Sequence, residues 1–312
     1  MADRVKAAVI GVGHLGKHHA RILGAMDDVD LVAIADIDAD RATAAAAASG
    51  ARTTKDYREL FDAVDAVSIA VPTELHHQVA LGFLERGKGV LIEKPMARSV
   101  READELIAVA ARTGATLLVG HTERYNPAVA AVWPLISAPR FIEVHRLGSF
   151  PDRSLDIDVV FDLMIHDLDI ILAMVKADVA AFEAVGVPVL TSKYDIANVR
   201  LRFANGCIAN VTASRISRER VRKIRFFQPD TYISIDYAEQ EVEGWRLVRR
   251  PDGERPGIEG GQLPVKREEP LRRELVDFIA AVRGERRPLV TGEDGRRALA
   301  LAQQIAERME SV

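Results

Sequence analysis

Residues 7–23 read AAVIGVGHLGKHHARIL, and this stretch decides the fold of the N-terminal third of the chain. A short apolar run leads into the glycine motif GVGHLG at residues 11–16, and a helical pattern follows from about Leu15. A second apolar run, residues 31–35, ends at Asp36, which lies twenty residues after the third glycine. A strand, a glycine loop, a helix and an acid at the end of the next strand predict a dinucleotide-binding unit. The alternative is a glycine-rich turn in an ordinary α/β domain, because the glycine motif alone is a weak signal.

Each part of this motif has a physical reason. Gly11 allows the tight turn, Gly13 lets a pyrophosphate approach the backbone, and Gly16 lets the helix pack against the strand. The helix N-terminus offers N–H groups and partial positive charge to the phosphates. Asp36 can accept hydrogen bonds from the adenosine ribose, and it favours NAD because it repels a 2′-phosphate and no arginine follows directly. We expect the cofactor to contact the loop and this acid: Gly11, Val12, Gly13, His14, Leu15, Gly16 and Asp36.

The composition is typical of a soluble globular protein with two domains. The chain has 312 residues, which is long for one core, and its formal net charge of −4 gives no overall attraction to nucleic acid or membranes. Cys207 is the only cysteine, so no disulfide can form within the chain, as is usual in the cytoplasm. We expect no signal peptide, and no stretch approaches the roughly 18 apolar residues of a membrane span.

Strands and helices alternate up to Gly120. Continuous apolar strands, such as those at 66–71, 89–95 and 116–120, are separated by helical patterns. This alternation predicts an α/β fold with a parallel, doubly wound Rossmann sheet. We assign this NAD-binding domain to residues 1–121.

After Gly120 the pattern changes. Helices are expected over residues 125–136 and 156–175, and residues 197–203 alternate strictly between apolar and polar. Further strand-like segments follow without intervening helices, which predicts a largely antiparallel sheet with one polar face. Residues 249–269 are rich in proline, glycine and charge and are expected to form an irregular loop.

The second domain is therefore predicted to be of the α+β class. We assign it to residues 122–312. Its last helix, at about residues 292–310, is expected to pack back on the Rossmann domain.

Lys94 is the first candidate for chemistry. It lies in Glu93-Lys94-Pro95 at the carboxyl end of the fourth strand, and ligands of open α/β sheets bind at such ends. Its ammonium could lower the pKa of a substrate hydroxyl and stabilise a developing alkoxide. The alternative is an ordinary surface lysine after a strand.

Asp162 and His166 are spaced four residues apart, so they share one face of a helix. The aspartate could orient the imidazole and raise its basicity, which suits proton transfer to or from a hydroxyl. The alternatives are a structural ion pair and a metal site, but no further ligands with fixed spacing are evident. His18 and His19 lie within the first helix and are expected to be solvated or structural.

Three further segments carry candidate contacts. Pro72-Thr73 and the nearby His76 follow the third strand and could touch the cofactor, although Thr73 could instead cap the helix. The segment GHTERYNP at residues 120–127 could contact cofactor and substrate, or it could be an interdomain linker. The basic residues within 215–225 could hold a phosphate group or form a solvated face.

Several motifs together resemble a known family. GVGHLG, the strand-end acid, AVPTELH, EKP, GHTERYNP and DLMIHDLD resemble, in this order, the glucose–fructose oxidoreductase/inositol dehydrogenase (Gfo/Idh/MocA) family. The resemblance implies a Rossmann domain followed by a domain with a large open sheet that often forms dimers or tetramers. It also implies that Lys94, Asp162 and His166 are catalytic. His121 departs from the aromatic residue that usually follows the glycine of this segment.

A narrower resemblance concerns the substrate. GHTERYNPAV and RKIRFFQPDTYISIDY are similar to the branch that oxidises the 3-hydroxyl of UDP-N-acetylglucosamine, a lipid A precursor. An inositol or simple-sugar dehydrogenase and a non-catalytic NAD-binding regulatory protein are the alternatives. Further cofactor contacts are expected at Pro72, Thr73, His76, Glu93, Lys94 and His121. Substrate contacts are expected at Lys94, Arg124, Tyr125, Asn126 and His166, and no metal site is expected.

Overall fold

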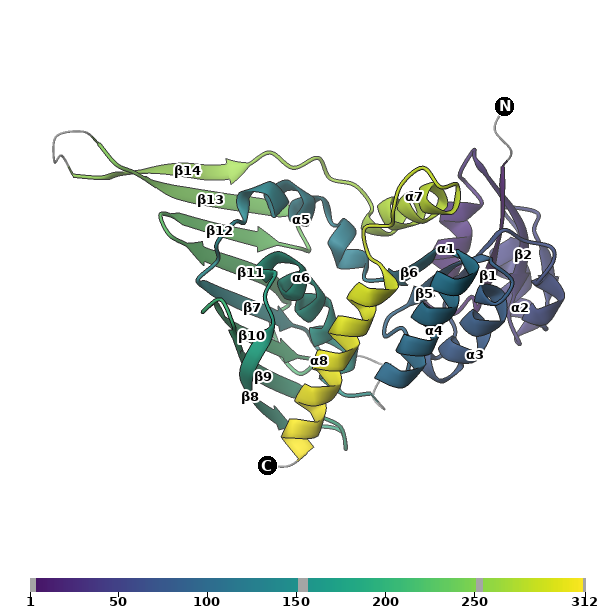
Figure 1. Cartoon of the computed structure of the whole chain (residues 1–312), viewed down its shortest axis with the longest axis horizontal. Coiled ribbons are helices and arrows are strands. Elements are labelled where there is room, and N and C mark those ends of the chain that lie inside the picture. Colours follow the sequence, from purple (N-terminus) through teal and green to yellow (C-terminus); the bar gives the residue numbers. More distant parts are fainter. Residues whose placement is uncertain (1–3, 151–156, 251–254, 311–312) are drawn as a thin grey trace. The chain divides into compact units, whose positions relative to one another are not determined.

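The computed structural model describes residues 4–150, 157–250 and 255–310, and the chain divides into two compact units (Figure 1). The first unit comprises Met1–Thr122 and Glu269–Leu299, and the second comprises Glu123–Glu268 and Ala300–Val312. Residues 269–299, which the sequence assigns to the second domain, thus belong to the first unit. No helix among the described residues is long and apolar enough to cross a membrane.

The first unit contains a six-stranded parallel sheet. Its order is β3-β2-β1-β4-β5-β6, and every neighbouring pair runs parallel, so the predicted doubly wound Rossmann topology is confirmed. The strands are β1 (Val5–Ile10), β2 (Val29–Ala35), β3 (Arg52–Thr54), β4 (Ala66–Ile69), β5 (Gly89–Glu93) and β6 (Leu117–Gly120). The central strands read as continuous apolar runs because helices cover both faces of such a sheet.

Helical segments connect these strands, and one further helix, α7 (Pro270–Val282), comes from the C-terminal part of the chain. The connecting segments are α1 (Gly16–Leu23), α2 (Ala39–Ala46), the 3₁₀ turn η1 (Tyr57–Leu60), α3 (Thr73–Leu84) and α4 (Val100–Thr113). Helix α4 begins after Ser99, whose hydroxyl accepts a hydrogen bond from the backbone N–H of Glu102, and it ends at Gly114 in the left-handed conformation. Helix α8 (Gly292–Glu310) starts in the first unit and ends in the second.

The second unit is built on an eight-stranded sheet of order β14-β13-β12-β11-β7-β10-β9-β8. Only β7 and β10 pair in parallel, so the predicted antiparallel character is confirmed. The strands are β7 (Phe141–Leu147), β8 (Val179–Val187), β9 (Ile196–Phe203), β10 (Ile208–Ser214), β11 (Val221–Gln228), β12 (Thr231–Asp236), β13 (Glu241–Val248) and β14 (Gly257–Leu263). Residues 197–203 alternate between buried and exposed, as their sequence predicts.

Strand β14 corrects one expectation, since its residues lie in the segment predicted to be an irregular loop. It pairs antiparallel with β13, and Gly260 and Gly261 face Trp245 and Gly244. A Cβ atom on Gly260 would lie 2.0 Å from the carbonyl oxygen of Gly244, so only glycine fits there. Gly260, one of the glycines that suggested a loop, is thus required by a close approach of two strands.

Two predicted helices of the second unit are also interrupted. The segment expected to be one helix over 125–136 consists of the 3₁₀ turn η2 (Thr122–Tyr125), helix α5 (Pro127–Val132) and the 3₁₀ turn η3 (Trp133–Leu135). The segment expected to be helical over 156–175 is a π-helical turn η4 (Val160–Met164) continued by α6 (Ile165–Val175), and residue 156 lies outside the described residues. π turns of this kind occur frequently at functional sites.

Candidate active site

The glycine loop between β1 and α1 has the geometry that a dinucleotide requires. Gly11 has a φ of +83°, and a Cβ atom there would lie 2.8 Å from the carbonyl oxygen of Ala70. A Cβ atom on Gly16 would lie 1.9 Å from the carbonyl oxygen of Gly11, so helix and loop touch directly. A Cβ atom on Gly13 would meet no protein atom within 4 Å. The protein itself needs the first and third glycines, whereas the space beside Gly13 is open to a pyrophosphate.

Asp36 closes this loop from the end of β2. Its buried carboxylate accepts hydrogen bonds from the backbone N–H groups of Val12 and Asp38, both at 2.8 Å. Nη2 of Arg41, on helix α2, lies 3.3 Å from the same carboxylate. Asp36 therefore orders the glycine loop, a second role that its position in the sequence did not indicate.

The tip of the loop is solvent-accessible. Val12 is buried, whereas His14 is exposed and Leu15 is 39% exposed. These two exposed side chains directly precede helix α1, where the sequence predicts cofactor contacts.

Lys94 follows β5 and is half-buried beside a buried carboxylate. Oε1 of Glu93 lies 3.1 Å from Nε2 of His19, and Nδ1 of His19 lies 2.7 Å from the hydroxyl of Ser68. Burial favours the protonated form of Glu93, but His19 and Lys94 outweigh it, so the pKa of this carboxyl lies below its ordinary value. The lysine thus follows an ionised, internally held acid.

His19 is a residue whose contact with the Lys94 segment the sequence did not reveal. Its position within helix α1 places it on the buried face, and the interaction with Glu93 joins residues that are 74 positions apart. A histidine on the inner face of a predicted helix was the only signal available.

Glu274, on helix α7, is a second buried acid of the first unit. The hydroxyl of Thr122 donates to its Oε2 at 3.0 Å, and its Oε1 has no hydrogen-bond partner among the described residues. Burial, with the negative charge of Glu93 nearby, raises the pKa of Glu274 well above its ordinary value. The pKa values of these two buried carboxyls are therefore shifted in opposite directions. His121, predicted to contact the cofactor, is also fully buried.

The turn after β4 carries the other predicted cofactor contacts. Helix α3 begins at Thr73 and has no side-chain cap, so the structure does not support the capping role considered for this threonine. His76 is buried, and its two ring nitrogens each lie 2.9 Å from a backbone carbonyl oxygen, of Val71 and of Pro95.

Asp162 and His166 belong to the second unit, at the junction between the π turn and helix α6. Both are half-buried, whereas the neighbouring Asp167 and Asp169 are fully buried. No three His, Cys, Asp or Glu side chains within residues 4–150, 157–250 and 255–310 are grouped so that they could hold a metal ion.

Two buried ion pairs hold helix α6 in place. Arg124 binds Asp169 through two hydrogen bonds of 2.8 and 3.0 Å, and Arg146 binds Asp167 through two of 2.6 and 3.0 Å. Burial raises the pKa of Asp167 even though the guanidinium opposes it. Both aspartates follow His166 in helix α6, so the two ion pairs fix the helix that carries it.

Two other residues predicted to bind substrate are buried as well. Asn126 caps helix α5 by accepting a hydrogen bond from the N–H of Ala128, and its amide donates to the carbonyl oxygen of Tyr237. Tyr125 is 4% exposed. Arg124 and Asn126 of the segment GHTERYNP thus make hydrogen bonds inside the protein, and the substrate contacts of this segment stay predictions.

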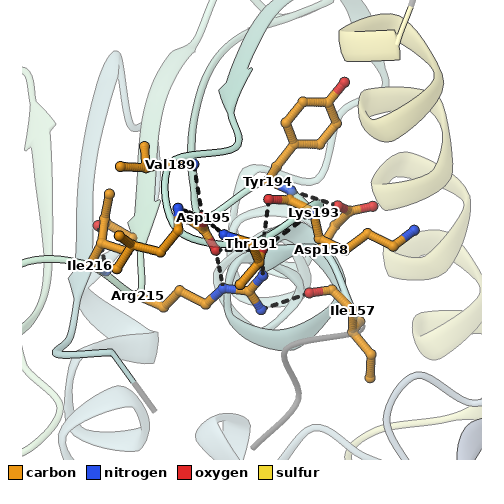
Figure 2. Close-up of polar contacts among 11 residues, drawn as sticks. Ile157, Asp158, Val189, Thr191, Lys193, Tyr194, Asp195, Arg215 and Ile216 are labelled. Atoms are coloured by element: carbon orange, nitrogen blue, oxygen red, sulfur yellow. Dashed lines mark hydrogen bonds and ion pairs between the residues drawn. The ribbon is translucent and has the colours of Figure 1, made fainter. Parts of the chain in front are cut away.

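Arg215 matches neither alternative considered for the basic residues within 215–225, a phosphate ligand or a solvated face (Figure 2). The side chain is 1% exposed, and its guanidinium donates to Asp195, to Thr191 and to the carbonyl oxygen of Ile157. Asp195 in turn accepts three hydrogen bonds from the backbone N–H groups of residues 189–191, which holds its pKa below its ordinary value against the effect of burial. The cluster fastens the loop before β9 to the segment that leads into the π turn.

The sequence matches two family models. The first is described as "Oxidoreductase family, NAD-binding Rossmann fold" and covers residues 5–121. The second is described as "GFO/IDH/MocA C-terminal domain" and covers residues 138–230.

Similar proteins include several sugar dehydrogenases. UDP-N-acetylglucosamine 3-dehydrogenase of Acidithiobacillus ferrooxidans is 38% identical over 311 residues, with 98% of each chain covered. Inositol 2-dehydrogenase of Rhizobium meliloti is 27% identical over 340 residues, again with 98% of each chain covered. A solved structure of the A. ferrooxidans enzyme has a TM-score of 0.92 and 37% identity, covering 99% of this chain and 98% of that one.

Proposed function

Since the chain belongs to the Gfo/Idh/MocA family of NAD-binding oxidoreductases, we propose that it oxidises the 3-hydroxyl of UDP-N-acetylglucosamine to a ketone. The observation that carries this proposal is the 38% identity, over almost the whole of both chains, to an enzyme named for that reaction. An open space beside Gly13 and an acid at the end of β2 supply the cofactor end of the site. A nucleotide sugar would place the reaction in the assembly of a lipid A precursor.

We propose separate roles for three residues at the substrate hydroxyl. We propose that His166 removes the hydroxyl proton, because an imidazole titrates near neutrality and helix α6 holds it rigidly. Lys94 and Asp162 position the hydroxyl, and the ammonium stabilises the negative charge that develops on its oxygen. NAD, when bound, supplies the hydride acceptor.

The proposed cofactor contacts are the glycine loop, Asp36 and the turn at Pro72 and Thr73. Asp36 makes NAD the preferred cofactor, since its carboxylate would face a 2′-phosphate. The buried pairing of Arg124 with Asp169, and the capping role of Asn126, favour a structural rather than a substrate-binding role for these two residues.

The direct test mixes the protein with NAD and UDP-N-acetylglucosamine and follows NADH absorbance. His166→Ala and Lys94→Ala should each retain NAD binding, measured by calorimetry, and lose turnover. The matched control is His77→Ala, whose side chain contacts only the exposed Glu105 among the interactions that the structure gives it. Near-normal turnover in His166→Ala and Lys94→Ala would contradict the role assignment.

Two other outcomes would replace the proposal. NADH formation with inositol or a simple sugar, and none with the UDP-sugar, would identify a different substrate. Tight NAD binding without turnover on any sugar would indicate a regulatory protein.

We further propose a cytoplasmic homodimer or homotetramer. Trp245 and Leu247 on β13 and Ile258 on the neighbouring edge strand β14 are exposed apolar side chains, which supports an interface there. The buried free thiol of Cys207 is compatible with a reducing compartment. Light scattering of the purified protein distinguishes these assemblies from a monomer.

A further inference from the structure

His76 joins two turns of the first unit through its buried ring. The residue lies in the first turn of helix α3 and is 1% exposed. Nδ1 lies 2.9 Å from the carbonyl oxygen of Pro95, and Nε2 lies 2.9 Å from the carbonyl oxygen of Val71. Both nitrogens are therefore engaged with the backbone of the chain.

The chemistry of these contacts restricts what the ring can do. A backbone carbonyl oxygen only accepts hydrogen bonds, and a neutral imidazole carries a single N–H. The neutral ring thus donates to one of the two carbonyls, and the protonated ring donates to both. Burial lowers the pKa of His76 below its ordinary value. The hydrogen bonds to the two carbonyls and the negative charges of Glu93 and Glu74 act in the opposite direction but do not outweigh burial. In either state the ring holds a turn through a hydrogen bond that an aliphatic side chain cannot make.

The two turns lie where the proposed chemistry takes place. Val71 follows β4 and Pro95 follows β5, and these neighbouring parallel strands end at the same edge of the sheet. Ligands of open α/β sheets bind at this edge. Pro95 directly follows Lys94, so the carbonyl that His76 contacts belongs to the turn that carries the lysine.

We propose that His76 is a positioning residue for Lys94, which it serves by fixing the backbone turn 94–95 against the turn at residue 71. The proposal rests on the proposed function, because it takes Lys94 to act on the substrate hydroxyl. It replaces the direct cofactor contact that the sequence suggested, since both ring nitrogens already face protein oxygens.

If His76 positions Lys94, its replacement should lower kcat while leaving the affinity for NAD nearly unchanged. Without the ring, Lys94 is displaced relative to the hydroxyl, and a displacement of about 1 Å in a catalytic group can cost on the order of a hundredfold in rate. We expect kcat of His76→Leu to fall about ten- to a hundredfold, while the Kd of NAD stays within about threefold of the parent value. His76→Gln restores an N–H donor, so about three- to tenfold of the lost rate should return.

The experiment compares His76→Leu and His76→Gln with the parent protein. Turnover is measured with NAD and UDP-N-acetylglucosamine, the Kd of NAD is measured by calorimetry, and circular dichroism reports folding. His77→Leu and His77→Gln are the matched controls, because His77 is the next residue of the same helix and contacts the exposed Glu105. If His76→Leu does not fold, His76→Gln carries the same two measurements against the parent.

The outcomes separate this inference from the proposed function. Parent-like turnover in the His76 variants, or equal losses in Leu and Gln, would overturn the positioning role, and so would a loss of NAD affinity that matches the loss of rate. A Lys94→Ala variant is assayed beside them. Full turnover in Lys94→Ala would contradict the proposed function, whereas an inactive Lys94→Ala with a fully active His76→Leu contradicts only the inference about His76.

Discussion

Replacing Gly13 by alanine tests whether the glycine loop receives a pyrophosphate. The Cβ atom that this substitution adds would meet no protein atom within 4 Å, so the folded protein has room for it. Where the backbone tolerates alanine, replacing glycine stabilises a protein by about 0.4–1 kcal/mol, because the unfolded chain loses freedom. Gly13→Ala should therefore unfold at the same temperature as the parent or slightly above it.

In contrast to thermal stability, the affinity for NAD should fall in Gly13→Ala. The added methyl group would stand where the pyrophosphate approaches the loop, and one lost hydrogen bond to a charged group costs about 1.5–3 kcal/mol. Since about 1.4 kcal/mol corresponds to a factor of ten, the Kd of NAD should rise about ten- to a hundredfold.

Gly16→Ala is the matched control for this substitution. Its Cβ atom would lie 1.9 Å from the carbonyl oxygen of Gly11, and backbone must move to admit it. Such overpacking costs about 1–3 kcal/mol or more, so this variant should lose thermal stability. Thermal unfolding by circular dichroism and calorimetric titration with NAD measure both quantities. An NAD affinity within about threefold of the parent in Gly13→Ala would refute the reasoning, as would a loss of stability equal to that of Gly16→Ala.

Three further results follow from buried and charged groups. Asp36→Asn should improve NADP binding relative to NAD by about tenfold, because the repelling charge is removed while Arg41 stays nearby; an unchanged preference in titrations with both cofactors would contradict this. The raised pKa of Glu274 makes its contribution to stability fall as the pH rises above about 4.3, the value of an unfolded glutamate. Glu274→Gln should therefore have a higher melting temperature than the parent, and the difference should grow as the pH rises above about 4.3; a difference that does not change with pH would contradict the raised pKa. Burial raises the pKa of Cys207 to about 11, so a thiol reagent at neutral pH should label it only in denaturant, and rapid labelling of the native protein would disagree.

The Rossmann sheet and the glycine loop could be predicted from sequence because their causes are local. The glycines of the motif GVGHLG predict a tight turn and a close contact between loop and helix. The positive φ of Gly11 and the close contact of Gly16 agree with this prediction. The alternation at 197–203 likewise matches a strand with one buried face. Lys94, Asp162 and His166 could be named from their motifs, and their catalytic roles stay predictions.

The sequence could not show which polar side chains are buried and already paired with partners inside the protein. Arg124 was expected to meet substrate, yet it is bound to Asp169, 45 positions away in the chain. Arg215 was considered for a phosphate, yet it is bound to Asp195 and to the backbone at residue 157 (Figure 2). No local sequence pattern distinguishes an arginine that binds an anionic ligand from one that is paired with a carboxylate of the same chain.

The sequence by itself therefore determined the parallel sheet of the cofactor half, the glycine loop with its acid, and the set of candidate catalytic residues. Periodicity and glycine geometry depend on neighbours along the chain, and these are visible in the sequence. Only the tertiary structure decided that Asp36 ties the loop together, that His19 lies against Glu93, and that His76 joins the turns after β4 and β5. A buried polar group is stable only beside a partner, and folding, rather than local sequence, brings that partner to it.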